Sequence, residues 1–293
     1  MTERSGLPAP PPLGAAALPD GTFEGRGVLV TGGGSGLGRA IAREFARLGA
    51  DLMLVGRRAD RLTAAREELS EFGGQVSAAV CDIREPGRIA EVFDAAEAAI
   101  GLPDVLVNNA AGNFPVAAED LTEGGWRAVV DITLSGTWFM TREFGRRHLL
   151  AGTPASVVSL GASYAWTGGP GYVHSAAAKA GVRSMVETLA VEWGPYGIQI
   201  NALVPGLVPH EDMTADLRGG LDRAGDKDLR QPALRVGRPR EIGWAATFLA
   251  SPYARFISGH TLVVDGANWQ RRTLVNDPVV TVREQLGRGP FEG

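Results

Sequence analysis

Short runs of apolar residues alternate with longer segments whose apolar positions recur at helical spacing along most of the chain. The short runs, rich in valine, isoleucine and leucine, predict strands, and the longer amphipathic segments predict helices. The expected strands are 27–31, 51–56, 76–81, 104–108, 155–160, 198–204 and 261–264. The expected helices are 36–48, 60–72, 86–100, 126–150, 174–193 and 239–250. This alternation predicts an α/β fold with a doubly wound parallel sheet, Rossmann-like and formed by a single domain.

The same pattern divides the chain into a central domain and two flanking parts. Residues 23–270 carry the pattern, and a chain of 293 residues with 44% apolar content is long enough for one large domain. Residues 1–22 are rich in proline and alanine and are expected to form a disordered tail, while 271–293 form a C-terminal extension. The stretch 206–237 is irregular and contains glycine and proline, so we expect a substrate loop there.

The composition argues against several classes of function. The net charge of −4 disfavours nucleic acid or an anionic membrane as the main partner, and no apolar run reaches the length of a membrane span. Cys81 is the only cysteine, which rules out an internal disulfide and suits a reducing, cytoplasmic environment. The four histidines show no metal-ligand spacing, so no metal site is expected.

The first predicted strand leads into a turn that is dense in glycine, and a predicted helix follows. Glycine lets the backbone bend sharply and approach a pyrophosphate, and the N-terminus of the helix then faces this anion. Such a turn can also be a flexible loop, but its position between strand and helix predicts a dinucleotide site. The expected cofactor contacts in this turn are Gly32, Ser35, Gly36, Leu37 and Gly38.

The ends of the next two predicted strands indicate which cofactor binds. Arg57 and Arg58 follow the second strand, where sites that prefer NAD carry an acidic residue. A guanidinium matches a 2′-phosphate, so NADP(H) is expected, although both arginines can also be solvated residues that open a helix. After the third strand, Asp82 can accept a hydrogen bond from the adenine amino group while Ile83 covers a ring edge. Asp82 can alternatively cap the next helix.

Several short motifs occur in the order and at the intervals of one known family. They are Thr31-Gly32 with Gly36 and Gly38, Asp82, Asn108-Asn109-Ala110, Lys179 and Pro205-Gly206. On these motifs, residues 24–268 resemble the short-chain dehydrogenase/reductase family. The resemblance implies that Asn109 lines the adenosine ribose of the cofactor and that Pro205, Gly206 and Val208 lie at the nicotinamide carboxamide. It also implies a homotetramer.

The chain departs from the usual active site of that family. The usual site combines asparagine, serine, tyrosine and lysine, with the tyrosine four residues before the lysine on one helix face. Here Ser175 stands at the tyrosine position before Lys179, while Ala162 and Thr133 replace the serine and the asparagine. A serine hydroxyl is too weak an acid to replace a tyrosine, which disfavours ordinary alcohol–ketone chemistry.

The replaced residues resemble those of the 2,4-dienoyl-CoA reductase branch of the family. The likeness lies in Ser175, Lys179, Tyr164 and Asn113. It implies that Tyr164 and Asn113 bind the thioester carbonyl, and that Ser175 and Lys179 hold the nicotinamide ribose. Hydride transfer to a conjugated thioester leaves negative charge on the thioester oxygen, which two fixed hydrogen-bond donors can stabilise. The expected function is therefore NADPH-dependent reduction of an unsaturated acyl-CoA, above all a 2,4-dienoyl-CoA.

Simpler interpretations of these residues stay open. Tyr164 can be an aromatic residue that covers the sheet edge, and Asn113 can serve only to form a turn. The resemblance also points to Arg84, Phe114 and Thr122 as contacts of the acyl-CoA, although an arginine in a loop is most often solvated.

Other functions compete with the expected one. A trans-2-enoyl-CoA reductase shares the sequence around Ser175, and an ordinary carbonyl reductase would need Tyr172 or His174 as its acid. A non-catalytic NADP-binding sensor would also lack the usual tyrosine. A pure sensor has no need of the pair formed by Tyr164 and Asn113, which favours an enzyme.

Overall fold

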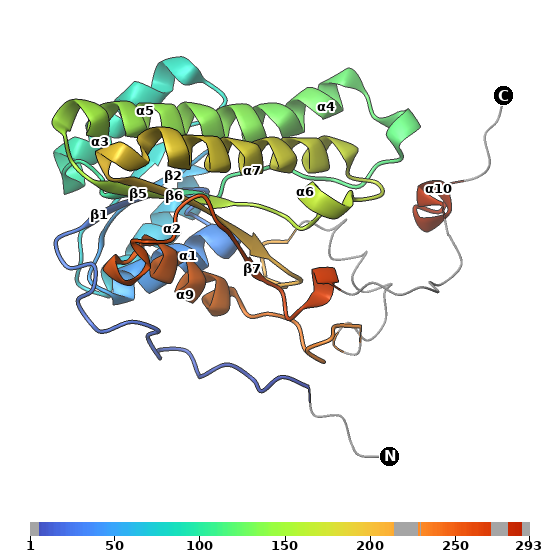
Figure 1. The fold of residues 1–293 in the computed structure, drawn as a ribbon, viewed down its shortest axis with the longest axis horizontal. Coiled ribbons are helices and arrows are strands. Elements are labelled where there is room, and N and C mark those ends of the chain that lie inside the picture. The colour runs from blue at the N-terminus through green and yellow to red at the C-terminus, as the bar shows by residue number, and fades with distance from the viewer. Residues whose placement is uncertain (1–5, 214–227, 229, 271–280, 289–293) are drawn as a thin grey trace.

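A sheet of seven parallel strands crosses the molecule in the order β3-β2-β1-β4-β5-β6-β7 (Figure 1). The computed structural model describes residues 6–213, 228, 230–270 and 281–288. The strands are β1 (Gly27–Thr31), β2 (Asp51–Gly56), β3 (Val76–Val80), β4 (Val105–Asn108), β5 (Ala155–Leu160), β6 (Ile198–Pro205) and β7 (Thr261–Val264). Their order and direction confirm the predicted doubly wound sheet.

Helices cover both faces of this sheet (Figure 1). One face carries α1 (Gly36–Arg47), α2 (Ala59–Ser70) and α9 (Pro239–Ala250). The other carries α3 (Pro86–Ile100), α5 (Gly136–Ala151) and α7 (Val173–Trp193). Each layer has its own hydrophobic cluster, because alternate strand residues point to opposite faces. In β1, for example, Val28 and Val30 join one cluster and Leu29 joins the other.

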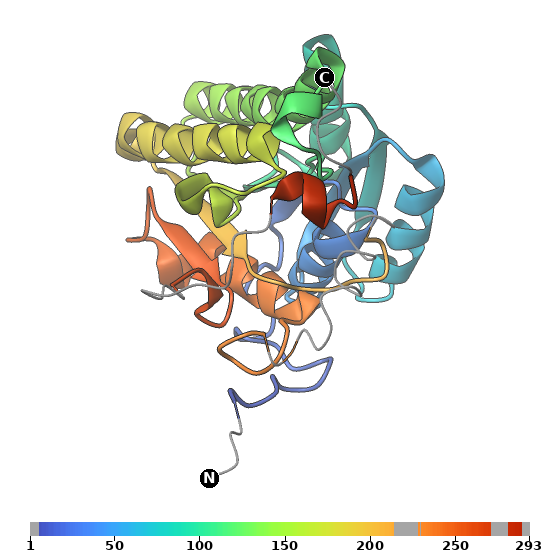
Figure 2. The ribbon, with the colours of Figure 1, turned by 90° about the vertical axis from the view of Figure 1, so that its right-hand side faces the viewer.

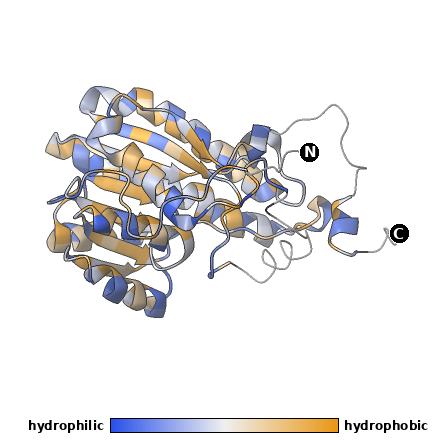
Figure 3. Ribbon diagram, turned by 90° about the horizontal axis from the view of Figure 1, so that it is seen from below, coloured by the Kyte–Doolittle hydropathy of each residue, from blue (hydrophilic) through white to orange (hydrophobic). Residues whose placement is uncertain are grey.

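The strands are the most hydrophobic elements, and the helices show mixed faces (Figure 3). A strand buried on both sides must be apolar throughout, whereas a covering helix needs only one apolar stripe. The strands were therefore the easiest elements to predict from the sequence. Their observed bounds agree with the expected ones to within a residue at each end.

The predicted helix 126–150 corresponds to three consecutive helical segments in the structure. It begins earlier, as α4 (Glu123–Val130), passes through a π-helical turn at Asp131–Ser135 and continues as α5. A π turn of five residues is too short to show a period of its own, so the sequence pattern did not reveal it. The pattern also missed α6 (Tyr164–Thr167) and α10 (Val282–Gln285), because helices this short have no full period to detect.

The strand order reverses between β1 and β4, which opens a crevice at their carboxyl ends. Hydrogen bonds hold the two strand exits together. The backbone N–H groups of Asn109 and Ala110 both donate to Thr31 Oγ1 at 3.0 Å. Asn109 Nδ2 donates to the Thr31 carbonyl oxygen at 3.0 Å. The switch point is thereby a rigid platform for side chains that follow each strand.

The flanking parts contact the domain where the structure describes them. The backbone N–H of Leu7 donates to the carbonyl of Ala233 at 2.9 Å, and Arg240 Nε donates to the Pro11 carbonyl at 2.9 Å. The predicted disorder of residues 1–22 concerns motion and stays a prediction. The predicted substrate loop 206–237 falls partly outside the described residues. In the described part of the chain, no helix has both the length and the hydrophobicity needed to cross a membrane.

Candidate active site

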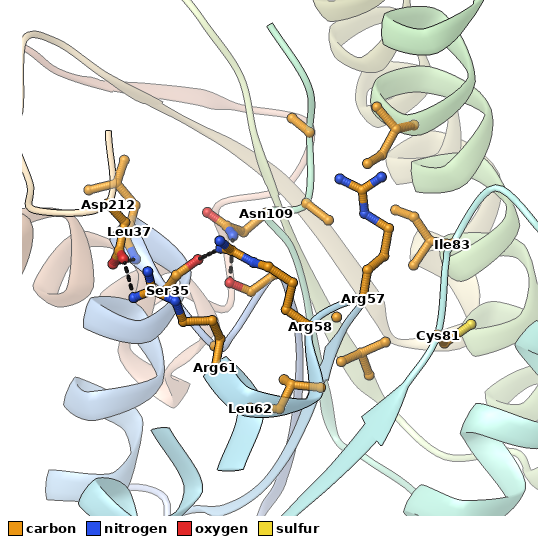
Figure 4. A pocket seen from close by; sticks show the side chains of 18 of the residues that line it. Ser35, Leu37, Arg57, Arg58, Arg61, Leu62, Cys81, Ile83, Asn109 and Asp212 are labelled. Atoms are coloured by element: carbon orange, nitrogen blue, oxygen red, sulfur yellow. Dashed lines mark hydrogen bonds and ion pairs between the residues drawn. The ribbon is translucent and has the colours of Figure 1, made fainter. Parts of the chain in front are cut away.

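A cavity of about 310 Å³ lies at the carboxyl edge of the sheet, between the exits of β1, β2 and β3 (Figure 4). Most of the residues expected to contact a cofactor line this cavity. These are Gly32, Ser35, Gly36, Leu37, Arg57, Arg58, Asp82, Ile83 and Asn109. The sequence motifs from four separate turns therefore meet in one place, although their roles toward a cofactor stay predictions.

The glycine-rich turn has the backbone conformation that the sequence argument requires. Gly32 and Gly36 adopt φ values of +66° and +54°, a region that residues with a Cβ rarely enter. Gly38 does not line the cavity. A Cβ atom there would collide with the Gly32 carbonyl and with Asn109 Nδ2, so Gly38 allows the helix to pack against the turn.

Arginine side chains surround one end of the cavity (Figure 4). Arg58 donates to Ser35 Oγ at 3.2 Å, and Arg57 lies 4.0 Å from Asp82. Arg61, on α2, joins them and was not singled out from the sequence. The cluster presents positive charge beside the glycine-rich turn, as a site for a phosphorylated ligand requires.

Asp82 and Arg84 bind one another. Arg84 Nε lies 3.0 Å from both carboxylate oxygens, and the backbone N–H of Arg84 donates to Asp82 Oδ1 at 3.0 Å. The hydrogen bonds from the guanidinium lower the pKa of Asp82. Asp82 thus closes a local turn and makes no side-chain cap of α3, whose N-cap residue is Glu85. Arg84, expected as a contact of the acyl-CoA, pairs with this carboxylate, and its role toward a substrate stays a prediction.

A further carboxylate reaches the cavity from the segment after β6. Asp212 Oδ2 accepts a hydrogen bond from the Gly36 backbone N–H at 2.8 Å, and its Oδ1 lies 2.8 Å from Arg61 (Figure 4). Burial alone would raise the pKa of Asp212, but the bond from Gly36 and the charges of Arg39 and Arg61 outweigh it and lower the pKa. An anion therefore sits at the N-terminus of α1, the position that favours negative charge. Sequence reasoning missed this residue.

A second group of residues lies nearer the centre of the sheet edge. Tyr164, on α6, has its hydroxyl 3.0 Å from Ser175 Oγ on α7. Asn113, in the segment after β4, donates from Nδ2 to the same Tyr164 hydroxyl at 3.3 Å. These three side chains thus form one hydrogen-bonded chain, and the predicted role of Tyr164 and Asn113 toward a thioester carbonyl stays a prediction. The side-chain amide oxygen of Asn113, Oδ1, is buried and has no hydrogen-bond partner among the described residues.

The surroundings of Tyr164 keep its phenol neutral. Burial raises the pKa of Tyr164, and the hydrogen bond with Ser175 offsets this only in part. Its ring stacks on that of Tyr172, with centroids 6.2 Å apart and planes 4° from parallel. Burial likewise raises the pKa of Tyr172. Both phenols are therefore hydrogen-bond donors near neutral pH, and neither is poised to lose a proton.

Lys179 lies one helical turn after Ser175 on α7 and is almost fully buried. Its ammonium group donates to the carbonyl oxygen of Leu160, at the end of β5. Burial lowers the pKa of Lys179 to about 8. The buried amine is thus anchored to the end of β5, one helical turn from Ser175.

The residue that replaces the family asparagine supports the loop that carries Asn113. Thr133 lies in the π-helical turn and is fully buried. Its Oγ1 accepts a hydrogen bond from the Gly112 backbone N–H at 3.4 Å. This contact ties the segment before Asn113 to the helix layer.

The expected substrate contacts divide into separate groups. Phe114 follows Asn113 and packs edge-on against the buried His174, with ring centroids 4.6 Å apart. Burial lowers the pKa of His174, so this imidazole is neutral. Thr122 is the N-cap of α4, where its Oγ1 accepts from the Gly125 backbone N–H at 3.1 Å. A Cβ atom at Gly125 would lie 3.1 Å from Phe114 Cζ and 3.3 Å from Thr122 Oγ1, so Phe114 and Thr122 lie close together. Arg84 is paired with Asp82.

Pro205, Gly206 and Val208 are not among the residues that line the arginine-lined cavity. Pro205 ends β6, and Gly206 and Val208 line a second cavity of about 330 Å³ together with Leu7 and Trp269. A Cβ at Gly206 would meet Asp265, so this glycine allows the exits of β6 and β7 to lie close together. In the described residues, no group of three or more histidine, cysteine, aspartate or glutamate side chains is arranged to hold a metal ion.

The sequence is similar to a known protein family and to several of its members. The model of a family described as enoyl-(acyl carrier protein) reductase matches residues 32–267. The chain is 39% identical over 255 residues to a "Probable 2,4-dienoyl-CoA reductase", (2E)-enoyl-CoA-producing, of Bacillus subtilis (strain 168), covering 84% of this chain and 98% of that one. It is 35% identical over 246 residues to the peroxisomal 2,4-dienoyl-CoA reductase, (3E)-enoyl-CoA-producing, of Mus musculus, covering 82% of each.

Solved structures agree. A short chain dehydrogenase from Bacillus anthracis has a TM-score of 0.77 and 38% identity, covering 83% of this chain and 96% of that one. A citronellol catabolism dehydrogenase from Pseudomonas aeruginosa PAO1 has a TM-score of 0.77 and 36% identity, covering 87% of this chain and 99% of that one. The resemblance stated from the sequence is thus confirmed: this chain belongs to the short-chain dehydrogenase/reductase family and is an oxidoreductase.

Proposed function

We propose that the protein is an NADPH-dependent reductase of unsaturated acyl-CoA thioesters, with 2,4-dienoyl-CoA as the preferred class of substrate. The observation that carries the proposal is the approach of Asn113 Nδ2 to within 3.3 Å of the Tyr164 hydroxyl. Two neutral donors from different elements are close enough there to share one acceptor oxygen. The 2,4-dienoyl-CoA reductases from Bacillus subtilis and mouse, at 39% and 35% identity, support the same class of substrate.

The chemistry follows from what these donors can do. Bound NADPH would supply the hydride that adds to a carbon of the conjugated chain. As the charge moves onto the thioester oxygen, Tyr164 and Asn113 donate hydrogen bonds to it. In a buried site each such donor contributes about 3 kcal/mol to the transition state. Because the pKa of Tyr164 is raised, the phenol holds its proton and stabilises the enolate as a donor. A proton from solvent then adds to a carbon of the enolate and completes the reduction.

The cofactor preference rests on the arginine-lined cavity. Arg57 and Arg58 follow β2 and line the same cavity as the glycine-rich turn, and Arg61 adds a further cation. A 2′-phosphate is the group that guanidinium side chains bind best at this position. Ser175 and Lys179 would hold the nicotinamide ribose, and Asp82 and Ile83 would lie at the adenine. A homotetramer and a cytoplasmic location stay predictions.

A spectrophotometric assay tests the proposal directly. Purified protein should oxidise NADPH with dienoyl-CoA thioesters faster than with enoyl-CoA thioesters, and only weakly with simple ketones. Product analysis would give the position of the remaining double bond. Oxidation of NADPH with none of the thioesters, over a range of chain lengths, would falsify the proposal.

The similarity to a citronellol catabolism dehydrogenase favours one competitor, a reductase of carbonyl compounds. In that case the acid has to be a group other than Ser175, and Tyr172 is the nearest phenol to Tyr164. Activity on ketones that survives Tyr164→Phe and disappears with Tyr172→Phe would support this competitor over the thioester reductase.

A further inference from the structure

The C-terminal segment 281–288 lies over the carboxyl edge of the sheet, in front of the loops that carry the candidate active site (Figure 2). The match to the family model ends at residue 267, so this segment lies outside the matched region. It contains α10, whose N-terminus is closed by reciprocal hydrogen bonds between Thr281 and Glu284. The segment thus has a defined structure of its own at that position.

Ion pairs connect this segment to the loop after Asn113. Arg283 lies 3.3 Å from both Glu119 and Asp120, which belong to the short helical turn Ala118–Asp120. Arg288 forms a second ion pair with Asp120. That turn is separated from Asn113 and Phe114 by only a few residues. The arginines therefore fasten the C-terminal segment to the part of the chain that carries one of the two proposed donors.

Val282 brings the segment close to the other side of the site. A Cβ atom added at Gly171 would lie 3.4 Å from Val282 Cγ1, so the Val282 side chain lies beside this glycine. The Gly171 carbonyl accepts from the Val116 backbone N–H at 2.9 Å, and the next residue is Tyr172, which stacks on Tyr164. Val282 is therefore seated where the loop of Asn113 and the tyrosine pair meet.

We propose that residues 281–288 form the outer wall of the acyl-binding pocket and limit the length of acyl chain that the enzyme accepts. The inference rests on the proposed function, because it concerns the substrate of that same site. A chain that extends past Tyr164 and Tyr172 toward Gly171 meets Val282. Short acyl chains fit inside this wall, whereas longer chains have to displace the segment.

The ion pairs of Arg283 and Arg288 are weak enough to let a long acyl chain displace the segment. Surface ion pairs are individually weak and are screened by salt, so the segment is held by a marginal balance of contacts. Reversing the charges of Arg283 and Arg288 would repel them from Glu119 and Asp120. The wall should then open without any change to Tyr164, Asn113 or the cofactor cavity.

The test compares kcat/KM for short-chain and long-chain dienoyl-CoA thioesters. Three proteins are needed: the full chain, a chain that ends at residue 280, and the double variant Arg283→Glu with Arg288→Glu. The double variant Arg66→Glu with Arg88→Glu, on α2 and α3, is the matched control for charge. We expect the ratio of long-chain to short-chain kcat/KM to rise about tenfold in the first two variants, mainly through KM, and to stay unchanged in the control. High salt should raise the same ratio in the full chain.

Two contrary results have different meanings. In the first, the full chain reduces thioesters while truncation and charge reversal leave the ratio of long-chain to short-chain kcat/KM unchanged. In that case residues 281–288 do not limit acyl length, and the proposed function stands. If the full chain reduces no thioester, both proposals fail together. Restoration of the original ratio by adding Glu119→Arg and Asp120→Arg to the charge-reversed variant would show that the ion pairs themselves hold the wall. The Kd for NADPH, measured by fluorescence, should be equal in all variants.

Discussion

The two halves of the carboxyl edge of the sheet differ in the charge of the side chains that they present. The half beside β1, β2 and β3 is built from charges, with Arg61 paired to Asp212 and Arg84 paired to Asp82. The half between β4, β5 and α7 presents neutral donors, in which Tyr164 bonds to Ser175 and Asn113. A permanently charged ligand is best bound by fixed charges of opposite sign. A charge that appears only during a reaction is best met by fixed, neutral dipoles.

The sharpest way to break this comparison is to remove the neutral donors. Tyr164→Phe and Asn113→Ala should each lower kcat about a hundredfold or more, since each deletes one donor to the developing oxyanion. KM should change far less. Because the two side chains touch, the double variant should lose less than the product of the two single losses. Steady-state kinetics on a dienoyl-CoA checks this. Tyr196→Phe, at an exposed position away from the site, is the control and should retain full activity.

Lys179 is a charged group in the half that otherwise presents neutral donors. The pH dependence of protein stability should reveal its burial. Burial lowers the pKa of Lys179 from 10.5 to about 8. Between these two values the unfolded chain binds more protons than the folded chain, so stability rises as pH increases through this window. The full shift corresponds to about 3 kcal/mol. Denaturant unfolding at a series of pH values should show this gain in the original protein and not in Lys179→Met. Parallel curves for the two proteins would mean that the amine is not held in a desolvated position.

The arginines of the charged half should decide between cofactors. Arg58→Ala should weaken NADPH binding about tenfold to a hundredfold, since a hydrogen bond to a charged group is worth about 1.5–3 kcal/mol. NADH, which lacks the 2′-phosphate, should bind with unchanged affinity. Calorimetric titration of both cofactors measures the difference, and Arg57→Ala repeats it for the second guanidinium. An equal loss for NADH would indicate that these side chains support the fold of the cavity and do not select the cofactor.

The difference between the halves also explains what the sequence could reveal. The charged half depends on motifs that are contiguous in the chain, such as Gly32 to Gly38 or Arg57 with Arg58, so its main residues were found. Thr122 lies at a Thr-Glu start of a helix, a capping signal that the structure bears out, while its role as a substrate contact stays a prediction.

The remaining features depend on contacts between distant residues. Asp212 reaches Gly36 across 176 positions, and Arg283 reaches Glu119 across 164. No local pattern encodes such pairs, because neither partner alone indicates the position of the other. Tyr164 and Asn113 are 51 positions apart, and only the resemblance to a known branch brought this pair to notice.

Asp212 offers the smallest and most specific test of the charged half. Its carboxylate accepts from the Gly36 backbone N–H, which is the group that a cofactor pyrophosphate is expected to use. The cofactor must therefore replace one anion by another, and part of its binding energy is spent on that exchange. Asp212→Asn keeps a hydrogen-bond acceptor but removes the charge, so the Kd for NADPH should fall by up to about tenfold. Glu211→Gln, at an adjacent exposed carboxylate paired with Arg39, is the control and should have a weaker effect. Inorganic pyrophosphate should compete with NADPH more strongly in Asp212→Asn than in the original protein. Weaker binding of both ligands in that variant would show instead that Asp212 holds the cavity in its binding conformation.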